Sequence, residues 1–169
     1  MENIIKLHLG CGDEILDGYI NCDVENIKAD MLFNAAKIPF PDNSIDEIKA
    51  YHLIEHFKYR EAFTVLKEWY RVLKPNGVLI METPDLLNSC QKFVDSNHLD
   101  RLEMYAHFFS TPDLSPAMTH YFLYTEKQME WTLNMVGFRN VQRVEPDSSH
   151  AKRRSDWKDI FLKIIAYKI

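Results

Sequence analysis

The sequence lacks any hydrophobic run that approaches the ~20 residues of a membrane-spanning helix, so no membrane association is expected. It also lacks an excess of basic side chains: 20 lysines and arginines stand against 25 acidic residues, which gives a formal net charge of −5. Nucleic acids and anionic membranes attract positively charged surfaces, so neither is an expected partner. The polar start, Met-Glu-Asn, is also unlike a signal peptide.

Cysteine is scarce, and its three residues show no CxxC spacing. An odd number of cysteines without such spacing is typical of reduced thiols, and we expect a cytoplasmic protein. Cys11 stands between two glycines, where a small filler is a simpler interpretation than a nucleophile.

What the chain does contain is an ordinary globular composition, with 46% hydrophobic and 27% charged residues. Its 169 residues suffice for one domain that buries roughly two thirds of its unfolded surface. No internal repeat or linker divides the chain, so we predict a single domain over residues 1–169. The sequence leaves the oligomeric state open.

The clearest motif lies in the first 24 residues. An apolar, β-branched run from Ile4 to Leu9 predicts a buried strand, and Gly10-Cys11-Gly12 follows it directly. A second short apolar run ends at Asp23. A glycine turn lets a ligand approach backbone amides, and a carboxylate can bridge two ribose hydroxyls, so this stretch predicts a nucleoside site.

Further strands are expected at residues 29–33, 45–51, 78–81, 138–144 and 160–167. Hydrophobic spacing from Ala62 to Leu73 predicts a helix that stops at Lys-Pro-Asn-Gly, residues 74–77. Strands that alternate with helices predict a parallel sheet covered on both faces.

The second half of the chain has its own signals. The pattern over residues 86–109 predicts helix in patches, and residues 110–116 are predicted to form an open loop. Thr125-x-x-Gln128 predicts a capped helix that ends at Gly137, and residues 145–158 form a polar loop.

A resemblance to class I S-adenosylmethionine-dependent methyltransferases is carried, in order and spacing, by the segments LHLGCG, GYINCD, IPFPDNSIDEI, LIEH and EWYRVLKPNGVLI. It spans residues 6–85 and continues more loosely through HYFLYTEKQMEWTLNMVGFRNV. The resemblance is closest to small members with a shortened first helix. It implies a three-layer, Rossmann-like α/β fold with strand order 3-2-1-4-5-7-6 and strand 7 antiparallel. It also implies that residues 86–124 form a lid or acceptor-pocket insertion.

The resemblance implies S-adenosyl-L-methionine as cofactor and S-adenosyl-L-homocysteine as product. Methyl transfer would be an in-line displacement, for which the protein must chiefly hold, orient and desolvate the reactants. Asn34 would face the adenine amino group, although a loop residue that caps its own backbone is an equal alternative. The residues that match the family's cofactor site are Gly10, Cys11, Gly12, Asp23, Asn34, Ala35, His52 and Leu53.

A small-molecule or glycan-like acceptor is expected. No Asn-Pro-Pro-Tyr follows the fourth expected strand, and no Pro-Cys follows the fifth, so the motifs of nucleic-acid methyltransferases are missing. A histidine in the insertion could take a proton from the acceptor, and His120 and His107 are the candidates. Either could instead be an ordinary packed residue.

The spacing of the first motif departs from a dinucleotide fold. Gly12 and Asp23 are 23 − 12 = 11 residues apart, whereas the acid of a dinucleotide site lies about 20 residues on. This argues against a nicotinamide or flavin enzyme. It also leaves room for only a turn or so of first helix, so a non-catalytic, methyltransferase-like binding module stays open.

A second alternative comes from HLIEH at residues 52–56, which matches the H-x-x-E-H pattern of inverted zinc peptidases. On a helix, His52 and His56 could hold zinc with Glu126 or Glu130 as a further ligand, while Glu55 polarised a water. The family resemblance accounts for the same letters without a metal, and we expect no metal site.

Overall fold

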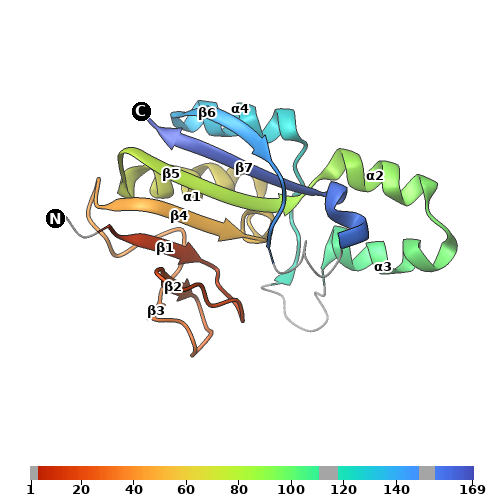
Figure 1. Ribbon diagram of the computed structural model, residues 1–169, viewed down its shortest axis with the longest axis horizontal. Coiled ribbons are helices and arrows are strands. Elements are labelled where there is room, and N and C mark those ends of the chain that lie inside the picture. The colour runs from red at the N-terminus through yellow and green to blue at the C-terminus, as the bar shows by residue number, and fades with distance from the viewer. Residues whose placement is uncertain (1–3, 111–117, 149–154) are drawn as a thin grey trace.

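The computed structural model describes residues 4–110, 118–148 and 155–169 (Figure 1). Seven strands form one sheet: β1 (Lys6–Leu9), β2 (Ile20–Asp23), β3 (Met31–Leu32), β4 (Ile45–Tyr51), β5 (Leu73–Pro84), β6 (Phe138–Val144) and β7 (Phe161–Lys168). The helices are α1 (Tyr59–Val72), α2 (Leu86–Asp95), α3 (His98–Phe109) and α4 (Glu126–Val136), with the 3-10 helices η1 (Ile54–His56) and η3 (Ser155–Ile160). No helix within the described ranges is long and apolar enough to cross a bilayer.

The strand order is β3-β2-β1-β4-β5-β7-β6, which confirms the expected topology. β1 lies inside the sheet, with β2 and β4 as parallel neighbours. β7 runs antiparallel to both β5 and β6. The carboxyl ends of β1, β2, β4 and β5 therefore meet at one edge, where ligands bind in open α/β sheets.

The core forms between the sheet and α1, because the helical spacing puts one apolar stripe on the sheet. The buried side chains of that stripe are Ala62, Val65, Leu66, Trp69 and Val72. They join Leu9 and Ile48 in one hydrophobic cluster, and α4 packs against α1. Both helices lie behind the sheet in Figure 1.

The connections between the first four strands all lie within described residues, and none of them contains a helix. Only ten residues, 10–19, separate β1 from β2, fewer than the dozen or so that a helical crossover needs. Cover by helices on both faces was expected, yet α1 and α4 share one face. On the opposite face the Lys49 ammonium lies 4.8 Å from the Tyr19 ring centroid.

Several element boundaries differ from the sequence-based expectation. β1 begins at Lys6, β3 has two residues, and η3 occupies part of the expected polar loop. The expected stop at residues 74–77 lies inside β5, because Leu73 already pairs with Ile45 and a register shift follows. Most of the expected loop 110–116, and residues 149–154 of the polar loop, lie outside the described residues.

Candidate functional site

The glycine turn follows β1 and is folded tightly against its neighbours. Gly10 and Gly12 both have positive φ, +63° and +49°, a backbone region that favours glycine. A Cβ on Gly10 would stand 2.8 Å from a terminal carbon of Leu53. The Cys11 amide donates to the Cys22 carbonyl over 3.0 Å. Two residues expected to line the cofactor site, Gly10 and Leu53, are therefore in contact.

Cys11 is buried, and burial raises the pKa of its thiol to about 11, with the Asp23 charge adding to the shift. The thiol is therefore protonated at neutral pH, which makes it a poor nucleophile. This agrees with its expected role as a filler.

Asp23 ends β2 and binds the glycine turn directly. Its Oδ2 accepts the Gly12 amide at 3.0 Å, and its Oδ1 accepts the amides of Glu25 and Asn26 at 3.0 and 3.1 Å. Burial alone would raise the pKa of this carboxyl, but the backbone hydrogen bonds from Glu25, Gly12 and Asn26 lower it below the ordinary value. Asp23 is thus a carboxylate at neutral pH.

The expected nucleoside site depends on free acceptor positions on Asp23 and on space beside the turn. A carboxylate offers about four lone-pair positions. The amides of Gly12, Glu25 and Asn26 use three of those on Asp23, and a backbone hydrogen bond from Val24 also lowers the pKa of this carboxyl. A Cβ built on Gly12 meets no atom within 4 Å, so the space beside the turn is open. Ribose binding by Asp23 stays a prediction.

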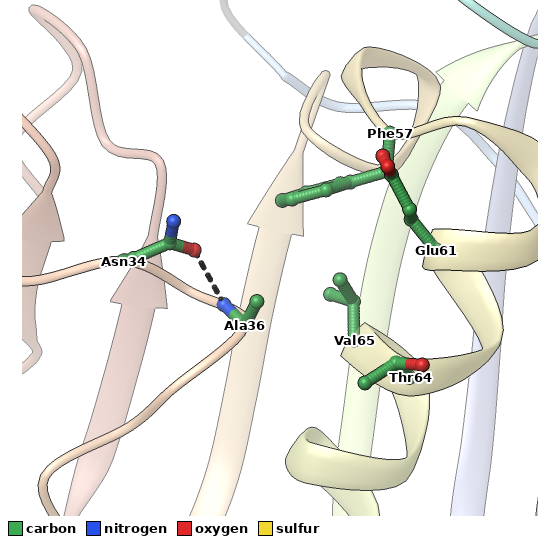
Figure 2. A pocket seen from close by; sticks show the side chains of 6 residues that line it. All are labelled: Asn34, Ala36, Phe57, Glu61, Thr64 and Val65. Atoms are coloured by element: carbon green, nitrogen blue, oxygen red, sulfur yellow. Dashed lines mark hydrogen bonds between the residues drawn. The ribbon is translucent and has the colours of Figure 1, made fainter.

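Asn34 lies on the connection between β3 and β4, at the rim of a pocket of about 300 Å³ (Figure 2). The pocket is lined by Asn34, Ala36, Phe57, Glu61, Thr64 and Val65. The Asn34 side-chain oxygen accepts the Ala36 amide at 2.8 Å, so the backbone-capping interpretation describes this residue. The Ala35 carbonyl accepts the Trp69 indole N–H at 3.0 Å. An adenine contact by Asn34 or Ala35 stays a prediction.

His52 follows β4 with a positive φ of +50° and lies between two buried carboxylates. Its Nδ1 is 3.2 Å from Glu55 Oε1, and its Nε2 is 3.4 Å from Glu82 Oε1. Burial opposes charge on the imidazole, but hydrogen bonds to Glu55 and Glu82 raise the pKa of His52 to about 9. Both ring nitrogens face carboxylates, so a cofactor contact by His52 stays a prediction.

Glu82 was missed by the sequence analysis. It is fully buried near the end of β5, where its Oε2 accepts the amides of Asp147 and Ser148 at 3.1 and 3.3 Å. Burial opposes its ionisation, yet the hydrogen bonds from His52 and Ser148 lower its pKa. The available signal was an acid within the apolar run VLIMETP, because a buried acid requires a partner.

His120 and His107, the two candidate bases, are linked through the backbone. The Nδ1–H of His120 donates to the His107 carbonyl over 3.0 Å. His120 lies beside His56, with ring centroids 4.9 Å apart, whereas the His107 Nε2 is 2.8 Å from the Ser89 hydroxyl. Their catalytic roles stay predictions.

The zinc peptidase alternative is not favoured by this geometry. That motif requires His52 and His56 to share a helix face, but η1 begins only at Ile54. The His52 nitrogens are engaged by two glutamates instead. Glu126, one expected further ligand, pairs with Arg143 at 3.1 Å.

Comparisons with known proteins point to one family. The model of a methyltransferase domain matches residues 15–81. A probable S-adenosylmethionine-dependent methyltransferase of Mycolicibacterium smegmatis is 38% identical over 52 residues, which cover 31% of this chain and 20% of that protein. The ubiquinone/menaquinone biosynthesis C-methyltransferase UbiE of Neisseria gonorrhoeae is 42% identical over 50 residues, 30% of this chain and 20% of that protein. The chain thus matches about a fifth of the length of these relatives.

Solved structures extend the likeness over the whole fold. A methyltransferase from Archaeoglobus fulgidus aligns with 98% of this chain and 86% of its own, with a TM-score of 0.62 and 16% identity. One from Methanosarcina mazei aligns with 100% and 94%, with a TM-score of 0.63 and 20% identity. At this identity the likeness shows the shared fold.

Proposed function

We propose that the chain is a class I S-adenosylmethionine-dependent methyltransferase and that it methylates a small-molecule or glycan-like acceptor. The matched methyltransferase-domain model, the curated relatives and the shared fold support this assignment. When bound, S-adenosylmethionine supplies the methyl group from its sulfonium centre. The observation that carries the proposal is the junction of β1 and β2, where the Gly12 amide meets the Asp23 carboxylate at the carboxyl ends of the strands.

The chain's own residues would hold and orient the cofactor. Asp23 would accept a hydrogen bond from a ribose hydroxyl, and Gly10 and Gly12 would border the methionine part. Leu53, packed on Gly10, would exclude water from the same side. Asn34, Ala35 and His52 complete the proposed set.

The acceptor would lie beyond the carboxyl end of β5. In Figure 1, α2 and α3 extend past that end of the sheet, which supports residues 86–124 as a lid or acceptor-pocket insertion. His120 is better placed there than His107, because its Nδ1–H is already donated and its Nε2 keeps a lone pair. Burial lowers the pKa of His120, with Glu55 opposing the shift, so the ring is neutral at pH 7.

Two features support the proposed setting. Cys11, Cys22 and Cys90 are free thiols, in keeping with a reducing, cytoplasmic environment. The net charge of −5 supports an acceptor other than nucleic acid.

Calorimetric titration with S-adenosylhomocysteine tests the proposal. Asp23→Ala should cost about 1.5–3 kcal/mol of binding, or roughly ten- to a hundredfold in affinity, because a hydrogen bond to a charged group is lost. Asp17→Ala, an exposed aspartate in the same β1–β2 connection, is the matched control and should bind as the parent does. Thermal unfolding of each variant shows whether it is folded.

Two outcomes would count against the proposal. Equal affinity of parent and Asp23→Ala would remove Asp23 as the ribose ligand. No binding by the parent at millimolar ligand would favour a methyltransferase-like binding module in place of an enzyme.

A further inference from the structure

Three metal-ligating side chains meet at η1 and at the segment that precedes α4. One ligand atom each from Glu55, His56 and His120 lies within 4.8 Å of the other two. Glu55 and His56 belong to η1, directly after β4, while His120 precedes α4. We propose that this Glu55–His56–His120 cluster binds a divalent transition metal, with Zn²⁺ as the best match.

Both imidazoles are held in the tautomer that a metal requires. His56 Nδ1 lies 3.1 Å from the Thr119 carbonyl, and His120 Nδ1 lies 3.0 Å from the His107 carbonyl. A carbonyl only accepts, so Nδ1 carries the hydrogen in both rings and Nε2 keeps a lone pair. Metal-binding histidines almost always donate their other ring N–H in this way.

Glu55 supplies the negative charge. Its side chain is fully buried, with Oε1 3.2 Å from His52 Nδ1 and Oε2 accepting the Thr83 hydroxyl at 3.0 Å. These partners orient the carboxylate but leave further lone pairs on both oxygens. In metal sites, ligating carboxylates are commonly oriented by hydrogen bonds of this kind from residues that do not touch the metal.

The backbone brings the two halves of the cluster together independently of a metal. The Glu55 carbonyl accepts the Tyr121 amide at 2.8 Å and the Phe122 amide at 3.3 Å. The chain around His120 is therefore fixed to η1 by hydrogen bonds. His56 and His120 are half-buried, whereas Glu55 is fully buried.

The chemistry of the three ligands selects the kind of ion. Two imidazole nitrogens and one carboxylate are a ligand set of zinc sites that keep a fourth position open, whereas Mg²⁺ and Ca²⁺ prefer oxygen ligands alone. Tetrahedral ligands at 2.0–2.1 Å from zinc stand about 3.4 Å apart. Binding would thus draw the three ligand atoms together by up to roughly 1.4 Å.

This site differs from the zinc peptidase alternative and from the expectation of no metal. His52 is not a ligand but an outer partner of Glu55. The inference does not depend on methyl transfer. When the metal is bound, however, His120 Nε2 is a metal ligand and is not free to accept a proton.

Metal uptake by the full chain tests the site. The protein is stripped with a chelator, dialysed against Zn²⁺ and analysed by mass spectrometry for bound metal, with one ion expected per chain. Co²⁺ should give the intense visible absorption of a four-coordinate site. A chain that takes up no stoichiometric Zn²⁺ would overturn the inference.

Variants locate the metal. Loss of a side chain that only hydrogen-bonds to a metal ligand already lowers metal affinity about 10–100-fold. Loss of a ligand itself, in His120→Gln or His56→Gln, should therefore weaken Zn²⁺ binding by more than ~100-fold. His98→Gln, an exposed imidazole at the start of α3, is the matched control and should bind as the parent does. Unchanged affinity in folded His120→Gln and His56→Gln would refute the assignment. S-adenosylhomocysteine titration of the same samples reports on the cofactor site separately.

Discussion

Asp23 binds three backbone amides and Gly10 leaves room for Leu53, so residues expected to hold the cofactor also hold the chain itself together. In the proposed complex the two functions would compete for the same atoms. A ribose hydroxyl would share the Asp23 carboxylate with the Gly12 amide. Gly12 and Asp23 meet because β1 and β2 are neighbouring parallel strands whose carboxyl ends lie side by side.

Gly10→Ala tests the packing of the glycine turn. An alanine at φ +63° costs about 1–2 kcal/mol from the left-handed conformation, and its Cβ would displace Leu53 at a further ~1–3 kcal/mol. Gly18→Ala is the control, because φ is +78° there but no atom lies within 4 Å of the added Cβ. Chemical denaturation should show the larger loss for Gly10→Ala, and Leu53→Ala in that background should recover part of it. Equal losses at Gly10 and Gly18 would exclude the Leu53 clash.

At the scale of elements, α1 connects the core to the rim of the proposed cofactor site. Its Trp69 is fully buried, and the indole N–H reaches the Ala35 carbonyl on the connection between β3 and β4. That connection contains no helix and carries Asn34. The position of Asn34 thus depends on a side chain from another element.

Trp69→Ala should reduce the free energy of unfolding by about 3–5 kcal/mol, because a large buried side chain leaves a cavity. Trp69→Phe keeps much of the apolar area but loses the N–H, so a smaller loss is expected, of which about 1 kcal/mol comes from the hydrogen bond. If the Ala35 contact positions the site, Trp69→Phe should also weaken S-adenosylhomocysteine binding. Parent-like affinity in a stable Trp69→Phe variant would contradict that role.

At the scale of the whole molecule, helices α1 and α4 share one face of the sheet, and a polar network covers part of the other. Lys163 of β7 is buried and lies 2.5 Å from Asp147, which also accepts the Tyr51 hydroxyl at 2.9 Å. The Lys163 ammonium lies 5.6 Å from the Tyr51 ring centroid. Charge and aromatic packing thus occupy part of the sheet face opposite α1 and α4.

This network should make stability depend on pH. Burial opposes charge on Asp147, but hydrogen bonds from Lys163 and Tyr51 lower its pKa in the folded chain. A lowered folded pKa gives stability that is complete above the unfolded value of about 3.9 and is lost as pH falls through the folded pKa. Asp147→Asn should lower the unfolding temperature at pH 7 and flatten its fall in acid. Asp17→Asn, the exposed control, should keep the parent's profile.

Local patterns in the sequence determined the elements. The span Ile45–Tyr51 and the Thr125 cap match the structure, because strand alternation and helix capping depend on near neighbours in the chain. The strand order was implied by the family resemblance, whereas the glycine turn and Asp23 were identified from their own residues. The start of β5 could not be placed this way, because pairing of Leu73 with Ile45 extends the strand across an expected turn.

Only the tertiary structure decided which side chains meet. Glu82 reaches His52 because parallel pairing sets Tyr51 beside Glu82, a register that no local pattern specifies. His120 reaches His56 across 120 − 56 = 64 residues because the Glu55 carbonyl binds the amides that follow His120. Contacts between distant residues depend on how strands pair and chains return, so the buried carboxylates and the proposed metal cluster emerge only from the folded chain.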